Sequence, residues 1–290
     1  MVVPLAPGGG SDIVGRIVAQ ALTEHWGKPV VVDNRPGAGT AVGTSITAKA
    51  PPDGYTVLVS NSSIAISPAL YKKLDFDIAR DFAPVTLLAS QPSMLAVHPS
   101  VPAKTLKELL AVATSSPGKI PYASAGIGSA THLGTELLMY ASKTTLLHVP
   151  YKSAGLATTA LLSGEAQVLL TNMASVIPHV STGRLRAIGI SSLNRSPLVP
   201  QVPTLSESGL AGFEYTTWYG MLVPRATPKA TIGEVHTATA GVLKLAQIAE
   251  RLVDQGLQPH GSTPPEFERY LKSEIDRWAK VVKAANIRVD

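Results

Sequence analysis

Two glycine-rich segments are the parts of this sequence best suited to bind an anion. They are Pro7–Asp12 and Gly126–Thr131, and each lies between an expected strand and an expected helix. Without side chains, backbone N–H groups approach a ligand closely, and the start of the helix adds partial positive charge. The pair suggests a carboxylate held between two loops. The alternative is that both are tight turns in which Ser11 and Ser129 cap helices.

A third glycine segment, Gly37–Gly43, follows another expected strand and partly matches a dinucleotide-binding pattern. Its third glycine comes one residue late, and the sequence contains no P-loop Gly-Lys-Ser/Thr. We expect a tight turn with close helix packing here. A nucleotide-dependent enzyme on a doubly wound scaffold remains the alternative function.

Signatures of hydrolases and metal sites are absent from the sequence. There is no Gly-x-Ser-x-Gly elbow and no His-Glu-x-x-His pair. His132 and Glu136 are spaced i, i+4, but a metal would need at least one more ligand, so we expect a hydrogen-bonded histidine at a cleft edge and no metal. Asp12 fits a first-turn helix acid at least as well as a ligand contact. We predict no cofactor.

Three aromatic residues and one amide could line a pocket. Trp218 and Tyr219 precede Gly220, and Tyr151 follows Pro150. Aromatic residues in strands are more often core. Asn172 is better placed, because it follows the expected strand 168–170 and such strand ends face the cleft in α/β folds.

Composition indicates a folded globular protein and excludes several classes. The chain has 290 residues, 45% hydrophobic and 16% charged, with a net charge of +5 and no cysteine. Disulfides, thiolate nucleophiles and cysteine-bound metals are therefore excluded. Basic residues are scattered, so we expect no nucleic-acid partner. The uncharged run 82–103 holds four prolines, which favours strands and loops over a membrane-spanning helix.

Short β-branched runs alternate with helical periodicity, which predicts βα units and mostly parallel sheets. One expected helix carries an apolar stripe, formed by Ile13, Val14, Ile17, Val18, Ala21 and Leu22. Thr105 and Glu108 form a capping box, and an amphipathic helix covers 267–285. The expected strands are 2–4, 30–33, 56–60, 85–88, 94–97, 120–124, 146–149, 168–170, 186–190 and 217–223.

Two stretches look like crossings between domains, namely His98–Pro102 and Pro197–Phe213. The first βα set lacks helices for both faces of its sheet, and the final helices need a sheet to cover. We therefore expect a discontinuous domain 1, residues 1–99 and 221–290, an inserted domain 2, residues 100–220, and a cleft between them.

Seven ordered motifs together resemble the Bug family, the extracytoplasmic solute receptors of tripartite tricarboxylate transporters. They are Pro4–Asp12, Asn34–Gly39, Pro52–Thr56, Asp81–Val85, Gly128–Leu133, His148–Lys152 and Gly183–Ala187. The resemblance implies a type II periplasmic-binding-protein fold, with two α/β domains joined by a hinge and closing around one small ligand.

The resemblance also implies a site. In the family, main-chain amides and bridging waters of the two glycine loops hold a ligand carboxylate. Carried over to this sequence, the loop residues are Leu5, Pro7, Gly8, Gly9, Ser11 and Asp12 from domain 1 and Ser129, Thr131 and His132 from domain 2. Ser62, Tyr151, Asn172 and Trp218 would shape the distal part of the pocket.

The implied function is a monomeric periplasmic receptor for a small organic anion: a carboxylate, an acidic amino acid or an aromatic acid. Its partners would be membrane transporter subunits or a sensor kinase, without membrane insertion of its own. Family precursors carry an export signal, and mature members usually have several residues before the first strand. Since Met1 directly precedes Val2, we expect a trimmed form.

Overall fold

The computed structural model describes residues 1–71, 73–284 and 287. Lys72 and the end of predicted domain 1, at 285, 286 and 288–290, lie outside the described residues. The chain forms two compact units, Met1–Ser90 with Trp218–Lys283 and Gln91–Thr217. Two strands, β4 (Phe82–Val97) and β9 (Thr216–Pro224), each contribute residues to both units.

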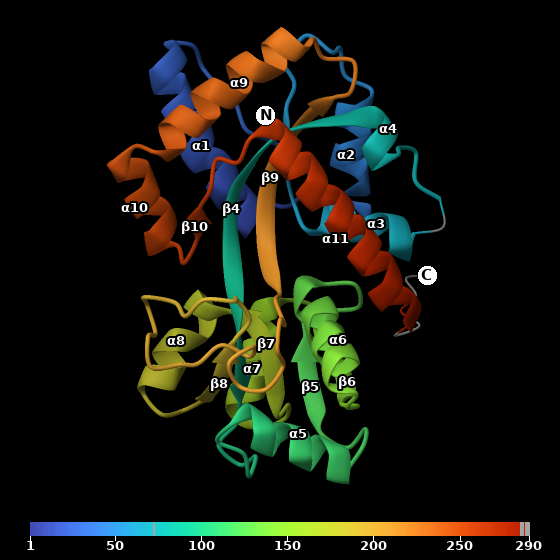
Figure 1. Ribbon diagram of the computed structural model, residues 1–290, viewed down its shortest axis with the longest axis vertical. Coiled ribbons are helices and arrows are strands. Elements are labelled where there is room, and N and C mark those ends of the chain that lie inside the picture. The colour runs from blue at the N-terminus through green and yellow to red at the C-terminus, as the bar shows by residue number, and fades with distance from the viewer. Residues whose placement is uncertain (72, 285–286, 288–290) are drawn as a thin grey trace. The chain divides into compact units, whose positions relative to one another are not determined.

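Unit 1 is a mixed sheet covered by helices (Figure 1). Strand β1 pairs in parallel with β2 and β3, while β3 is antiparallel to β9 and β10 is antiparallel to β4. Helix α1 packs against α9 and α10. Besides β4 and β9, the elements of unit 1 are β1 (Val2–Val3), α1 (Gly10–Trp26), β2 (Asp33–Asn34), η1 (Ala38–Thr40), α2 (Ala41–Ala48), β3 (Leu58–Asn61), α3 (Ser63–Leu70), α4 (Ile78–Asp81), α9 (Lys229–Leu243), α10 (Ala246–Asp254), β10 (Gln258–Pro259) and α11 (Pro264–Ala284).

Unit 2 is a second, smaller mixed sheet with helices. Strand β4 pairs antiparallel with β7 and β8, and β5 pairs in parallel with β6 and β7. Besides β4 and β9, its elements are α5 (Leu106–Ser115), β5 (Pro121–Ser124), α6 (Ala130–Ser142), β6 (Leu147–Pro150), α7 (Ala154–Ser163), β7 (Val168–Asn172), α8 (Met173–Ser181) and β8 (Arg186–Ile190).

Each unit has its own hydrophobic core. In unit 1 the apolar stripe of α1, including Val14 and Val18, packs on Val59 of β3 and Met221 of β9. In unit 2, Met94 of β4 lies in a cluster contributed by β7, β8, α7 and α8. The stripe predicted for α1 is confirmed.

The predicted break between strands 85–88 and 94–97 is wrong. Residues 82–97 form one strand, in which Gln91 and Ser93 are buried. The N–H of Ser93 donates to the Ser191 hydroxyl at 2.8 Å, and Ser191 donates its own N–H to the Ser93 carbonyl. These bonds keep the backbone paired beside Pro92, which has no N–H to contribute.

The boundaries between the two units fall inside strands β4 and β9, whereas the sequence analysis expected the chain to cross between domains in loops. Both expected crossings, His98–Pro102 and Pro197–Phe213, lie within unit 2. The predicted domain limits, 99/100 and 220/221, compare with unit limits at 90/91 and 217/218. A change of packing partner along a continuous strand leaves no mark in proline or glycine content. A hinge between two moving domains remains a prediction.

Strand β2 is displaced from the expected 30–33 to Asp33–Asn34. Its partner β1 begins at Val2, which is paired with Asp33. The capping box is confirmed in part: the Thr105 hydroxyl accepts the N–H of Glu108 at 3.2 Å, but the Glu108 carboxylate accepts from Lys104. No helix among the described residues is long and apolar enough to cross a membrane.

The amphipathic C-terminal helix, confirmed as α11, carries a buried carboxylate. Glu274 is 3% exposed, accepts the indole N–H of Trp218 at 3.0 Å and that of Trp278 at 3.3 Å, and pairs with Arg277 at 3.1 Å. The buried carboxylate of Glu274 thereby links helix α11 to Trp218 of strand β9, and it interacts with three side chains in all.

We predict that Glu274→Leu lowers the free energy of unfolding by about 3 kcal/mol, because two buried indole N–H groups and Arg277 lose their acceptor. Denaturant unfolding measures the change. Glu274→Gln keeps an acceptor and should lose less. The matched control, Glu268→Leu on the same helix, removes an exposed ion pair with Arg225 and should change stability by about 1 kcal/mol or less. Equal losses at both positions would contradict the prediction.

Candidate functional site

The first glycine loop is held in place by the carboxylate of Asp12. One Asp12 oxygen accepts the N–H of Gly8 at 2.9 Å and Nε of Arg16 at 3.0 Å, and the other accepts the Asn34 amide at 3.0 Å. The same amide group donates to the Leu5 carbonyl. The buried Asp12 thus organises the loop with its own hydrogen-bonding capacity taken up, which favours the structural role considered for it.

Electrostatics keep that carboxylate charged. Burial acts to raise the pKa of Asp12, but the hydrogen bonds from Arg16, Gly8 and Asn34 outweigh burial and leave the pKa below its ordinary value. The neighbouring Arg16 and the Asn34 amide therefore offset a negative charge beside the loop.

The second glycine loop is held by a matching bond. Nδ1 of His132 accepts the N–H of Gly128 at 3.1 Å. In both loops the acceptor lies four residues after a glycine of positive φ, +82° at Gly8 and +76° at Gly128. A residue with a Cβ would be strained at that φ, so the turn and its anchor together explain the glycine and the side chain that follows it.

Hydroxyl groups complete the second loop. The Ser129 hydroxyl caps α6 by accepting the N–H of His132 at 3.3 Å and donates to the Gly126 carbonyl at 2.6 Å. The Thr131 hydroxyl accepts the N–H of Ala125 at 2.8 Å and lies 3.1 Å from that of Ser129. The structure therefore brings Ser129, Thr131 and His132 together, and Ser129 does act as the helix cap of the alternative interpretation.

A polar network contacts this loop, and of its members the sequence analysis singled out only the pair His132 and Glu136. Rings of His132 and His148 are stacked with centroids 4.2 Å apart, and Nε2 of His132 lies 3.5 Å from Glu136. Tyr122 donates to Glu136 at 2.7 Å, and the Ser124 hydroxyl lies 2.6 Å from Nε2 of His148. Since Nδ1 of His132 accepts from Gly128, Nε2 is the ring nitrogen that faces Glu136.

The pKa values in this network follow from burial and neighbouring charge. Burial, with His132 nearby, lowers the pKa of His148 to about 4. Burial raises the pKa of Tyr122, and the hydrogen bond to Glu136 adds to that rise. For Glu136 burial acts to raise the pKa, but hydrogen bonds from His132 and Tyr122 outweigh it and the pKa is lowered. The described residues contain no group of three or more side chains able to hold a metal.

The remaining predicted site residues divide into exposed and buried ones. Leu5 is half-buried against the unit 1 core, and Pro7, Gly8 and Gly9 are exposed. Asn172 is exposed at the end of β7 and caps α8 through the N–H of Ala174. The half-buried Tyr151 donates a hydrogen bond to Glu165 at 2.9 Å. Burial raises the pKa of the Tyr151 phenol, and this hydrogen bond raises it further.

Two residues predicted for the distal pocket are fully enclosed in unit 1. Ser62 is 1% exposed and its N–H donates to the Trp218 carbonyl. The Trp218 ring is 0% exposed, with its N–H on Glu274 and an edge contact to Phe267. Trp218 is therefore placed in the core, which counts against its predicted role in the pocket.

The sequence contained two signals for the residues that anchor the first glycine loop. They are the motif that begins at Asn34 and the i, i+4 spacing of Asp12 and Arg16.

The third glycine segment is packed and closed. A Cβ on Gly43 would lie 2.8 Å from the Arg35 carbonyl and from Pro4, and one on Gly37 would meet Val42 at 2.7 Å. The predicted tight turn with close helix packing is confirmed.

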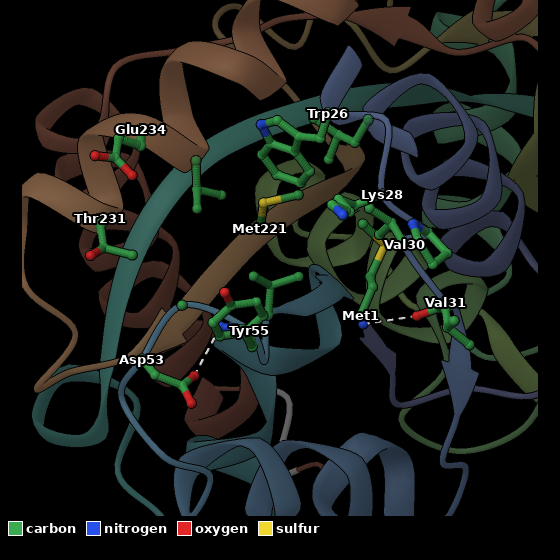
Figure 2. Close-up of a pocket in the computed structure, with 15 residues that line it drawn as sticks. Met1, Trp26, Lys28, Val30, Val31, Asp53, Tyr55, Met221, Thr231 and Glu234 are labelled. Carbon is green, nitrogen blue, oxygen red and sulfur yellow. Dashed lines mark hydrogen bonds between the residues drawn. The ribbon is translucent and has the colours of Figure 1, made fainter. Parts of the chain in front are cut away.

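Unit 1 also contains a cavity of about 690 Å³ away from the glycine loop (Figure 2). Its lining is mostly apolar, including Trp26, Val31 and Met221, and carries the carboxyl groups of Asp53 and Glu234 beside two cations, Lys28 and the N-terminal ammonium of Met1. None of the predicted site residues lines it. Because the two carboxyl groups balance the two cations, the cavity has no excess positive charge to attract an anion.

The combination of two α/β units, each with a glycine loop at a helix start, is that of a solute-binding receptor. The chain matches the TctC family model, described as "Tripartite tricarboxylate transporter family receptor", over residues 14–287. The protein belongs to this family and is a solute-binding receptor, not an enzyme, and the periplasmic-binding-protein fold expected from the sequence is confirmed.

Relatives and solved structures agree with this assignment. The chain is 34% identical to protein BugT of Bordetella pertussis, over 100% of this chain and 89% of BugT. It is similar to R. palustris Rpa4515 with adipate, with a TM-score of 0.85 and 31% identity over 99% of this chain and 97% of the other. It is also similar to MatC of Rhodopseudomonas palustris with bound malate, with a TM-score of 0.80 and 31% identity over 97% of each chain.

We predict that the stability of this protein falls between pH 6.5 and about 4 in part through His148. Its folded pKa is lowered, so the unfolded chain binds a proton in this window that the folded chain does not, and stability is retained above pH 6.5. Denaturant midpoints of wild type and His148→Asn at several pH values measure the contribution. The variant should show a shallower acid loss, and the exposed-site control His25→Asn should match wild type. An unchanged pH slope in His148→Asn would refute this assignment.

Proposed function

We propose that the protein binds a small organic anion through its glycine loops, for uptake by a tripartite tricarboxylate-type transporter. The observation that carries this proposal is the matched construction of the loops. In each, a helix start follows a glycine whose N–H is fixed by the residue four positions later. Such fixed N–H groups and helix ends bind anions without a cationic side chain.

The chemistry of the loops favours one carboxylate group. Arg16 is already paired with Asp12, so the groups left to meet a ligand are neutral donors and the partial charges of the helix ends. The two similar structures are of receptors with adipate and with bound malate, both dicarboxylates. For this chain the proposed ligands are small carboxylates, acidic amino acids or aromatic acids.

A receptor of this kind would present its loaded form to membrane transporter subunits or a sensor kinase, and we propose a periplasmic location and a monomeric state. Neither role requires catalysis.

We predict that Gly9→Leu abolishes binding. Gly9 has extended backbone angles, and its nearest neighbour to an added Cβ is the Ala6 carbonyl at 3.7 Å, so the variant should fold. The larger side chain would cover the start of α1. A thermal-shift screen with adipate, malate, glutamate, citrate and benzoate, and with NAD and ATP as contrast, measures binding; about 2.7 kcal/mol is gained at 100 times the dissociation constant.

The control for this substitution is Gly233→Leu, at an exposed helix position with open space around it. The empty Gly9→Leu protein should melt within about 4 °C of wild type, since a lost glycine cap costs about 1 kcal/mol. Full ligand affinity in Gly9→Leu, or shifts in the wild type with nucleotides only, would contradict the proposed function.

A further inference from the structure

Helix α1 begins without a side-chain cap. Its N-cap residue is Gly9, and no side chain accepts from the first turn, in contrast to α6, which Ser129 caps. The first turn of a helix leaves several N–H groups without partners in the helix itself. At the start of α1 those groups have no side-chain acceptor from the cap position.

A buried phenol is aimed at this helix start. The Tyr219 side chain is 4% exposed, and a side chain on Gly10 would overlap its hydroxyl, with Cζ of the ring only 2.7 Å from the added Cβ. Within the described part of the chain, the hydroxyl of Tyr219 makes no hydrogen bond. The ring is therefore packed in the core of unit 1, while its hydroxyl stays available to a ligand beside Gly10.

A second hydroxyl lies in the same turn. Ser11 is 1% exposed, and among the described residues its Oγ has no hydrogen-bond partner. Two unsatisfied hydroxyl groups, from α1 and from β9, therefore accompany the uncapped start of α1.

Strand geometry explains why Tyr219, and not its neighbour, reaches this place. Adjacent residues of a strand point to opposite faces of the sheet. Trp218 faces α11 and bonds to Glu274, whereas Tyr219 packs in the cluster that contains Val14 of α1. Tyr219 is paired with Asn61, the last residue of β3, so it lies at the edge of the sheet where β3 ends.

The structure assigns Tyr219 as a specificity-determining residue: its hydroxyl, supported by that of Ser11, donates a hydrogen bond to a carboxylate oxygen of the ligand at the start of α1. This inference rests on the proposed function and adds the side-chain donors. Burial raises the pKa of Tyr219 to about 12, so the group stays a neutral donor at ordinary pH. An O–H donor to a carboxylate forms a short, strong hydrogen bond. The glycine at position 10 leaves the space that the hydroxyl occupies.

The test is Tyr219→Phe, which removes the hydroxyl and keeps the packed ring. Isothermal titration calorimetry should show the affinity for the tightest-binding acid among adipate, malate, glutamate, citrate and benzoate fall about tenfold or more. The melting temperature of the empty protein should be nearly unchanged, because the ring stays packed and the hydroxyl has no partner among the described residues. Ser11→Ala should weaken binding in the same direction.

The matched control is Tyr55→Phe, the same chemical change at a 90% exposed position of unit 1. It should bind as wild type does. Wild-type affinity in Tyr219→Phe, together with lost binding in Gly9→Leu, would overturn this inference and leave the proposed function standing. A wild-type protein that binds none of the five acids would overturn both.

Discussion

The constraint on which this protein depends is the fixing of backbone N–H groups next to two helix starts. An anion bound without a paired cation needs donors that are already in position, because ordering a flexible glycine loop at the moment of binding would consume much of the interaction energy. The chain meets this need twice in the same way. Gly8 is held by Asp12 and Gly128 by His132, each from the first turn of the following helix.

The two anchors differ in chemistry, and their surroundings follow from that difference. Asp12 brings a negative charge close to an anion site, so Arg16 and the Asn34 amide balance it. His132 accepts the glycine N–H through Nδ1, and its other nitrogen faces Glu136, which also accepts the phenol of Tyr122. Each anchor thus has a second set of partners that fixes its orientation.

The helix starts also differ. Helix α6 uses Ser129 as cap and leaves hydroxyl groups that are largely engaged with the loop itself. Helix α1 has a glycine cap and, in its first turn, the Ser11 hydroxyl, which has no hydrogen-bond partner among the described residues. At the start of α6, by contrast, the hydroxyls of Ser129 and Thr131 are hydrogen-bonded within the loop.

The sequence by itself determined the βα alternation, the glycine loops, the stripe of α1, the amphipathic α11 and the family, because periodicity and short ordered motifs are local properties. Only the tertiary structure decided which of two adjacent aromatics lies beside the start of α1. Trp218 and Tyr219 look equivalent in the sequence, but strand alternation sends one to Glu274 in the core and the other to Gly10. Likewise the continuity of β4 through Pro92 depends on Ser191, which is distant in the sequence, and no local pattern encodes such a partner.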